Sequence, residues 1–174
     1  MASGVKLPLV PASFFGMVLG IVGLGGSWRA ATKVWALPAA IGETIILVGA
    51  LVWLVLLVLF VAKWIVAKQD AFEEVAHPVL CCFIGLAGVS TMLAAGALLP
   101  YSHIVAQILF GVGAIFTVLF AMWRTGGLWQ GGREPASTTA VLYLPSVAGS
   151  FVTAIVVSAL EWRIGANFSS APAC

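Results

Sequence analysis

The sequence predicts an all-α membrane protein with five transmembrane helices. The chain has 174 residues, of which 62% are hydrophobic and only 8% are charged, whereas a soluble domain is about 25% charged. No Asp, Glu, Lys or Arg occurs from Val75 to Trp123 or from Pro135 to Leu160. A helix needs about 20 mainly apolar residues to cross a bilayer. The first of these runs therefore holds two spans, separated by "PYSH", and the second run holds one.

The predicted spans divide into two kinds. They are residues 11–28, 41–62, 80–99, 102–123 and 140–160, within a single transmembrane domain of residues 1–174. The first follows Lys6 as a signal peptide would, but Trp28 and Arg29 stand where small cleavage-site residues are expected, so we predict a mature helix. The second and fourth contain no proline and are dense in Leu, Val, Ile and Phe. This composition is typical of peripheral, lipid-facing helices.

The first, third and fifth spans form a repeat. Each has a proline at or near its start, followed within about two turns by glycine and phenylalanine, and 67 residues separate Pro11 from Pro78 and again Pro78 from Pro145. This period predicts a helical hairpin with one inner and one outer helix. A proline in the first turn starts a helix, since its missing N–H needs no partner there, and one further along kinks the helix. Both interpretations stay open for Pro11 and Pro78, whereas an apolar run from Ala140 places Pro145 in or beyond the first turn.

Each of these three spans also has one face of small or polar residues. At 100° per residue, the faces comprise Gly16, Gly20 and Gly23, then Gly85, Gly88, Ser90 and Thr91, and last Ser146, Gly149, Ser150 and Thr153. Small residues let membrane helices pack closely, and hydroxyls bond across helices or back to their own carbonyls. The other explanation is the lining of a pore. Three such faces at one phase of the repeat favour a central path surrounded by the odd-numbered spans.

Charges at the span ends predict the orientation. With a cytoplasmic N-terminus, the inner side receives Lys6, Lys63, Lys68, Arg124 and Arg133, and the outer side receives Arg29, Lys33 and Arg163. Five cations against three satisfy the positive-inside rule. We therefore expect a multi-pass protein of the plasma membrane, the inner membrane of a bacterium, with the lipid bilayer as its first partner.

The remaining polar residues argue against several classes of function. The net charge is only +2 without a basic block, so nucleic acid is not expected as a partner. Cys81 and Cys82 lack metal-ligand spacing, and His77 and His103 flank span ends as loop residues. Glu43 is expected at the membrane interface near the outer end of its span. Without a catalytic or cofactor motif, we predict neither an enzyme nor a bound cofactor or metal. Pore width and dipoles would then discriminate among solutes. Helix N-termini, with their partial positive charge, would favour anions.

Five segments carry a resemblance to a known family. They are "PASFFGMVLG" in the first span, "FEEVAHPV" before the third, "STML" within it, "LWQGG" after the fourth and "YLPSVAGSF" at the fifth. The chain resembles the tellurite-resistance/dicarboxylate transporter family, the TehA-type proteins related to plant slow anion channels. The resemblance implies ten helices in five hairpins around a central pore, commonly in trimers, and passage of anions such as tellurite, C4-dicarboxylates and other small anions.

The resemblance and the helix faces together give the candidate residues. The expected pore-lining or kink positions are Pro11, Phe15, Gly16, Gly20, Gly88, Ser90, Thr91, Pro145, Ser146, Gly149, Ser150, Phe151 and Thr153. Phe151 matches a motif position but lies off the polar stripe of its helix. Gly88 stands where some relatives have proline, and it also permits a bend through its low helix propensity.

The length of the chain leaves two functions open. It has five predicted spans, about half the family length, so we expect a truncated domain or a short protein that needs other chains. The family's gating phenylalanine, in the ninth helix, has no counterpart. The expected function is an anion channel or carrier. The alternative is a non-transporting membrane protein, a truncated remnant or assembly partner in which the small faces serve packing alone.

Overall fold

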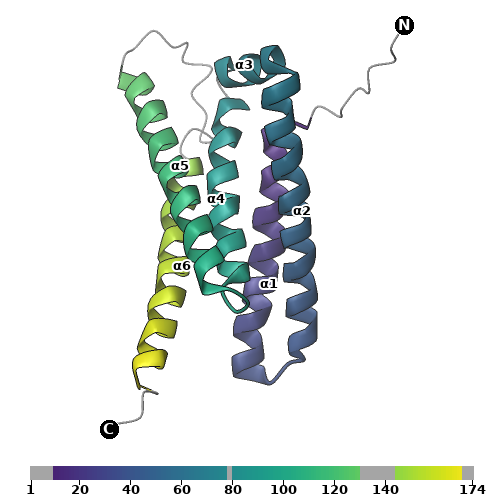
Figure 1. Cartoon of the computed structure of the whole chain (residues 1–174), viewed down its shortest axis with the longest axis vertical. Coiled ribbons are helices and arrows are strands. Elements are labelled where there is room, and N and C mark those ends of the chain that lie inside the picture. Colours follow the sequence, from purple (N-terminus) through teal and green to yellow (C-terminus); the bar gives the residue numbers. More distant parts are fainter. Residues whose placement is uncertain (1–9, 78–79, 130–143, 170–174) are drawn as a thin grey trace, which may run out of the picture.

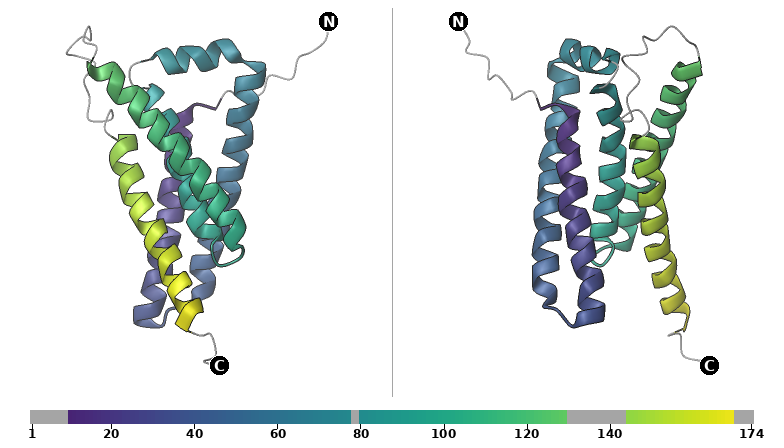
Figure 2. Two further views of the ribbon diagram at one scale, coloured as in Figure 1. Left: turned by 60° about the vertical axis from the view of Figure 1, so that its left-hand side comes forward. Right: turned by 180° about the vertical axis from the view of Figure 1, so that it is seen from behind.

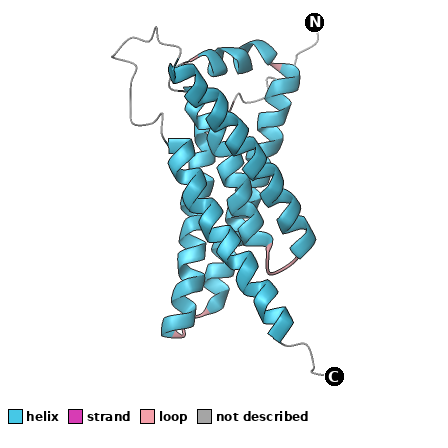
Figure 3. Cartoon of the chain, turned by 90° about the vertical axis from the view of Figure 1, so that its left-hand side faces the viewer, coloured by secondary structure: helices cyan, strands magenta, loops and turns pink. Residues whose placement is uncertain are grey.

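The described secondary structure is entirely helical. A computed structural model describes residues 10–77, 80–129 and 144–169. The elements are η1 (Ala12–Phe14), α1 (Phe15–Trp35), α2 (Ala39–Val66), α3 (Lys68–Ala76), α4 (Leu80–Leu98), α5 (His103–Trp129) and α6 (Leu144–Ser169) (Figure 1). Helices are the only regular structure in this part of the chain (Figure 3), which confirms the predicted all-α class.

Four of the described helices are long and apolar enough to cross a membrane. These segments are Ala12–Trp35, Ala39–Val66, Leu80–Leu98 and His103–Arg124. The fifth predicted span overlaps α6, whose described apolar part is the shorter segment Val147–Ala159. The start of that predicted span, residues 140–143, lies outside the described residues. A total of five spans therefore stays a prediction.

Local residues set the ends of the first hairpin. Pro11 is the residue before η1, with φ −68° and ψ 148°, so it starts a helix and does not kink one. α1 ends where Ala36 adopts the left-handed conformation at φ 50° and ψ 35°. Pro38 then precedes α2, and its carbonyl oxygen accepts a hydrogen bond from Trp28 Nε1 at 3.1 Å. Pro78, the second proline of the predicted repeat, lies outside the described residues.

Helix α4 lies at the centre of the molecule. It packs against α1, α2, α5 and α6, and 14 of its 19 residues are buried. By contrast, only 22% of the apolar stretches of α1 and of α2 and 17% of that of α5 are buried. Two further views show α2 and α5 at the periphery, with α1 and α6 on either side of α4 (Figure 2).

Glycines bring α4 and α5 into close contact. A Cβ atom at Gly113 would lie 2.8 Å from the carbonyl oxygen of Gly88 and 3.0 Å from the backbone nitrogen of Met92. Small residues are what allow membrane helices to approach so closely. A Cβ atom at Gly88 would in turn lie 3.0 Å from the carbonyl oxygen of Gly113, and the bend that the sequence permits at Gly88 stays a prediction. Gly88 therefore serves the contact with α5.

A buried hydrogen bond joins α2 to α4. Trp53 Nε1 donates to Thr91 Oγ1 at 3.2 Å, and the Thr91 hydroxyl donates to the carbonyl oxygen of Ala87 at 2.7 Å. Trp53 is 6% exposed. An indole N–H in such an apolar setting is costly to leave without an acceptor, so Thr91 fixes the position of α2 on α4.

We expect Thr91→Val to lower the free energy of unfolding by roughly 1 kcal/mol, because interhelical hydrogen bonds in membranes contribute about 0.6–2 kcal/mol. Unfolding in mixed micelles by increasing the fraction of dodecyl sulfate measures this change. Thr44→Val is the matched control, since Thr44 is exposed and its hydroxyl bonds only the carbonyl of Ala40. Equal losses in the two variants would contradict the role assigned to Thr91.

Candidate functional site: a pocket between three helices

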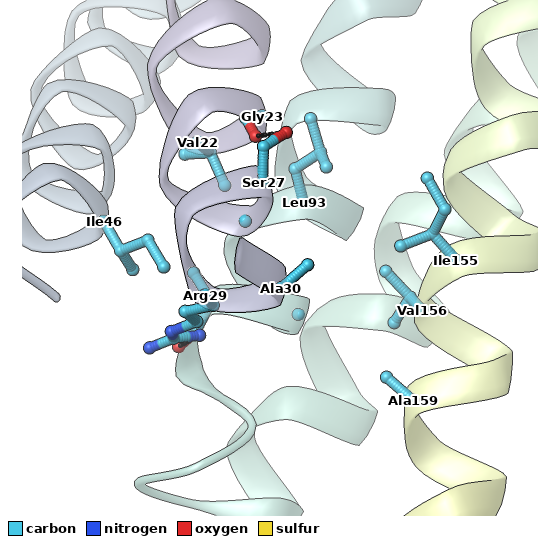
Figure 4. A pocket seen from close by; sticks show the side chains of 13 residues that line it. Val22, Gly23, Ser27, Arg29, Ala30, Ile46, Leu93, Ile155, Val156 and Ala159 are labelled. Atoms are coloured by element: carbon cyan, nitrogen blue, oxygen red, sulfur yellow. Dashed lines mark hydrogen bonds between the residues drawn. The ribbon is translucent and has the colours of Figure 1, made fainter. Parts of the chain in front are cut away.

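A pocket of about 370 Å³ lies between α1, α4 and α6. Its walls include Val22, Gly23 and Ser27 of α1, Leu93 of α4, and Ile155 and Val156 of α6. Figure 4 shows α1 and α6 on opposite sides of the pocket, with Leu93 between them. The three helices that the proline repeat singles out thus enclose one space, which α2 borders only through Ile46.

The glycine face of α1 is open. Gly16, Gly20, Gly23 and Gly26 are exposed, and a Cβ atom at any of them would meet nothing within 4 Å. Gly23 and Gly26 belong to the wall of the pocket. The Ser27 hydroxyl continues this face and donates to the carbonyl oxygen of Gly23 at 3.0 Å. Gly16 and Gly20, both predicted site residues, therefore lie on an open face of α1.

The predicted residues of α4 lie elsewhere. Ser90 is fully buried, and its hydroxyl donates to the carbonyl oxygen of Ala87 at 2.9 Å. Gly88 and Thr91 line a separate pocket of about 220 Å³ between α2 and α5. The structure does not bring Gly88, Ser90 or Thr91 to the walls of the pocket beside α1.

The predicted residues of α6 also face another direction. Gly149, Ser150 and Thr153 line a pocket of about 530 Å³ between α5 and α6. The Thr153 hydroxyl donates to the carbonyl oxygen of Gly149 at 2.7 Å and lies 3.6 Å from Met92 Sδ. Phe151 is 67% exposed and lines none of these three pockets. The α6 residues that reach the pocket beside α1 are instead Ile155, Val156 and Ala159.

The remaining predicted residues lie at helix starts. Phe15 is 2% exposed and packs edge-on against Phe60, with 5.6 Å between ring centroids. Pro145 and Ser146 belong to α6, which is described from Leu144. Their side chains, and the backbone before Leu144, lie outside what the structure describes, so the predicted kink at Pro145 is not tested.

Glu74 joins three elements at one end of the molecule. Its Oε1 accepts a hydrogen bond from the backbone N–H of Ala12 at 2.8 Å, and its Oε2 pairs with Lys63 Nζ. The side chains of Lys63 and Glu74 are only 9% and 6% exposed. A carboxylate at a helix start satisfies an orphan donor and complements the helix dipole. Sequence reasoning missed this role, although "PASFFG" and "FEEVAHP", the motifs that meet here, were both recognised.

A second charged cluster lies at the other end of α1. The guanidinium of Arg29 donates to both carboxylate oxygens of Glu43, at 2.8 Å and 2.7 Å. Tyr101, in the turn after α4, donates its hydroxyl to Glu43 Oε2 at 2.6 Å, and this hydrogen bond raises the pKa of the tyrosine because it stabilises the protonated phenol. Arg29 also lines the pocket. Glu43 is therefore the centre of a network joining α1, α2 and this turn.

The other polar candidates lie at helix starts or inside the packing. His77 Nδ1 accepts the backbone N–H of Leu80 at 3.2 Å, at the start of α4. His103 is the first residue of α5, and Cys81 and Cys82 are fully buried. Within the described ranges, His, Cys, Asp and Glu do not form a group of three or more that could hold a metal ion.

The described fold is that of an all-helical protein with four helices long and apolar enough to cross a membrane. The chain belongs to the SLAC1 family of voltage-dependent anion channels, which it matches over residues 10–169. It is also similar to a tellurite resistance protein TehA homolog from Haemophilus influenzae, with 29% identity over 155 residues. This match covers 88% of the chain and 47% of the homolog, so the chain spans about half the length of that relative.

Proposed function

We propose that the chain forms part of a passage for small anions, which runs between α1, α4 and α6. The observation that carries the proposal is the pocket beside the open glycine face of α1. Glycines and Ser27 of α1 face aliphatic side chains such as Leu93 and Ile155 across the pocket, so width, dipoles and hydrophobic constriction would discriminate among solutes. The three helices run in the same direction (Figure 1), and their positive N-terminal ends lie toward the same membrane surface. This arrangement favours anions over cations.

Several finer assignments belong to the same proposal. α6 is the fifth span, the N-terminus is cytoplasmic, and the membrane is the plasma membrane of a bacterium. The complete passage is formed in an assembly, a trimer by resemblance to the family. Tellurite and C4-dicarboxylates are the solutes to be tested beside chloride and nitrate, since tellurite resistance is the activity in the name of the Haemophilus relative.

A second function has its own support. Gly88 and Thr91 of α4 contact α5 and α2, and Ser90 is fully buried. These contacts are what a protein that only assembles with other membrane helices would need. In that case the small faces stabilise packing and no solute passes.

Flux into proteoliposomes separates the two functions. We expect chloride or nitrate to pass faster than potassium or sodium, and we expect Gly23→Leu to reduce anion flux at least several-fold while leaving the protein folded. The reason is that a Cβ atom at Gly23 would meet nothing within 4 Å and that Gly23 lines the pocket, so leucine has room to occupy it. Size-exclusion chromatography and unfolding in mixed micelles monitor the fold of the variant.

The matched control is Gly111→Leu on α5. A Cβ atom at Gly111 would also meet nothing within 4 Å, but Gly111 does not line the pocket, so this variant should conduct as the unchanged protein does. Faster cation flux, or the same flux in Gly23→Leu as in the unchanged protein, would contradict the proposed passage. An absence of flux above empty liposomes would favour the assembly function.

A further inference from the structure

Arg29 is the one charged residue among those that line the pocket between α1, α4 and α6 in the described part of the chain. Its charge is balanced by Glu43, which approaches both Nε and one terminal nitrogen of the guanidinium. Glu43 does not line the pocket. Arg29 therefore forms part of the pocket wall, whereas Glu43, which balances its charge, belongs to α2 and does not face the pocket.

The surroundings hold this pair in one arrangement. Tyr101 donates to Glu43 from the turn after α4, and a second terminal nitrogen of Arg29 approaches the carbonyl oxygen of Ala97 at 3.5 Å. The guanidinium points away from α6 (Figure 4). It does not fill the pocket, and it acts on the pocket through its electric field. Low-dielectric helix walls strengthen such a field compared with bulk water.

We propose that the Arg29–Glu43 pair sets the electrostatic potential of the pocket: Arg29 makes it attractive to anions, and Glu43 limits that attraction. The part of this inference that concerns transport rests on the proposed anion passage. A strong uncompensated cation would hold an anion too firmly for rapid release, and conduction requires binding that is favourable but weak. The paired carboxylate provides this moderation.

The potential can be measured without any transport assay. Ser27→Cys, in a Cys174→Ser background, places a thiol in the pocket wall, because Ser27 is exposed and lines the pocket; the native Cys81 and Cys82 are fully buried. The readout is the rate at which the introduced thiol reacts with a negatively charged methanethiosulfonate, divided by its rate with a positively charged one. We expect Glu43→Gln to raise this ratio and Arg29→Gln to lower it, each by roughly twofold to tenfold at low salt.

The decisive result is a change of the rate ratio in opposite directions in Glu43→Gln and Arg29→Gln. If the pair were only structural, breaking it from either side would change the site in a similar way. The double variant Arg29→Gln/Glu43→Gln removes both charges and should return the ratio close to its original value. Raising the salt concentration should shrink all the differences, since counterions screen the field.

Controls for charge lie on α3. Asp70→Asn and Lys68→Gln make the same changes in charge as Glu43→Gln and Arg29→Gln, at exposed positions, and α3 lies at the opposite end of the molecule from the α1–α2 turn (Figure 1). The inference would be overturned if the ratio of thiol reaction rates changed in the same direction in Glu43→Gln and Arg29→Gln. It would also be overturned if the α3 variants changed this ratio as much as the Arg29 and Glu43 variants do.

The same variants in proteoliposomes link the potential to flux. We expect the selectivity for chloride over potassium to rise in Glu43→Gln and to fall in Arg29→Gln. If the unchanged protein shows no flux while the thiol ratios shift in opposite directions, the proposed passage fails and the electrostatic role of the pair stands. If the unchanged protein conducts anions and neither the ratios nor the selectivity respond, the electrostatic role fails alone.

Discussion

Replacing Glu74 with alanine is expected to destabilise the protein by about 3–5 kcal/mol, the range found when one partner of a buried ion pair is removed. The change leaves Lys63 without its carboxylate in a site where its side chain is only 9% exposed. It also removes the acceptor of the Ala12 N–H at the start of η1. Unfolding in mixed micelles measures the loss, and protease digestion near residue 12 reports the loosening of this helix start.

The neighbouring glutamate provides the control. Glu73 lies on the same helix but is exposed, so Glu73→Ala should change the free energy of unfolding by less than about 0.5 kcal/mol. The double variant Lys63→Met/Glu74→Gln should recover most of the loss, because glutamine still accepts from Ala12 and no buried charge remains. If Glu73→Ala and Glu74→Ala destabilised the protein equally, the role assigned to the Lys63–Glu74 pair would be wrong.

Gly113→Leu is expected to separate α4 from α5 and to cost more than about 3 kcal/mol, above the usual range for overpacking. A side chain at this position meets the backbone of Gly88 and Met92, which cannot rotate away as a side-chain end can. Gly113→Ala should cost about 1–3 kcal/mol by the same mechanism. Unfolding in mixed micelles ranks the two variants.

Gly111 distinguishes this close contact from a general effect of glycine. A Cβ atom there meets nothing within 4 Å, and alanine favours the helix by about 1 kcal/mol over glycine. Gly111→Ala should therefore be neutral or stabilising. A loss in Gly111→Ala similar to that in Gly113→Ala would show that backbone flexibility, and not the contact with α4, decides the effect.

The helical class was predictable because the bilayer imposes it. A spanning segment must satisfy its backbone internally, and the charge-free runs therefore indicated helices wherever they were long enough. The ends were harder to predict, since charged residues continue several helices beyond the apolar run. α1 extends to Trp35, past Arg29, because the guanidinium bonds Glu43 and is not placed in lipid.

The faces of the helices were harder to assign than the helices themselves. Helical spacing places Ser90 and Thr91 on a small, polar stripe, but it does not state which neighbour that stripe meets. Thr91 meets Trp53, which is 38 residues earlier in the chain. On α1 the glycine spacing leads to an open face, so the same kind of pattern has different surroundings on two helices. Whether a small, polar face packs against another helix or lines a pocket depends on where the neighbouring helices lie, and a single sequence does not show this.

The charged contacts were missed for a related reason. Glu74 and Arg29 stand near the ends of predicted spans, where a charge is usually explained by the aqueous interface. Their partners come from other elements, and only the folded arrangement brings them together. The one available signal was the position of Glu74 inside a recognised motif, since a family motif in a connecting segment indicates a role beyond solubility.

The cap on the first helix has a consequence for biosynthesis. Ala12 and the carboxylate that accepts its N–H are 62 residues apart in the chain, so the ribosome completes α1 and α2 before the acceptor exists. Until that acceptor arrives, the N–H of Ala12 must be satisfied by another group, such as water. The start of the first helix therefore reaches its final contacts only after α3 has joined the α1–α2 hairpin.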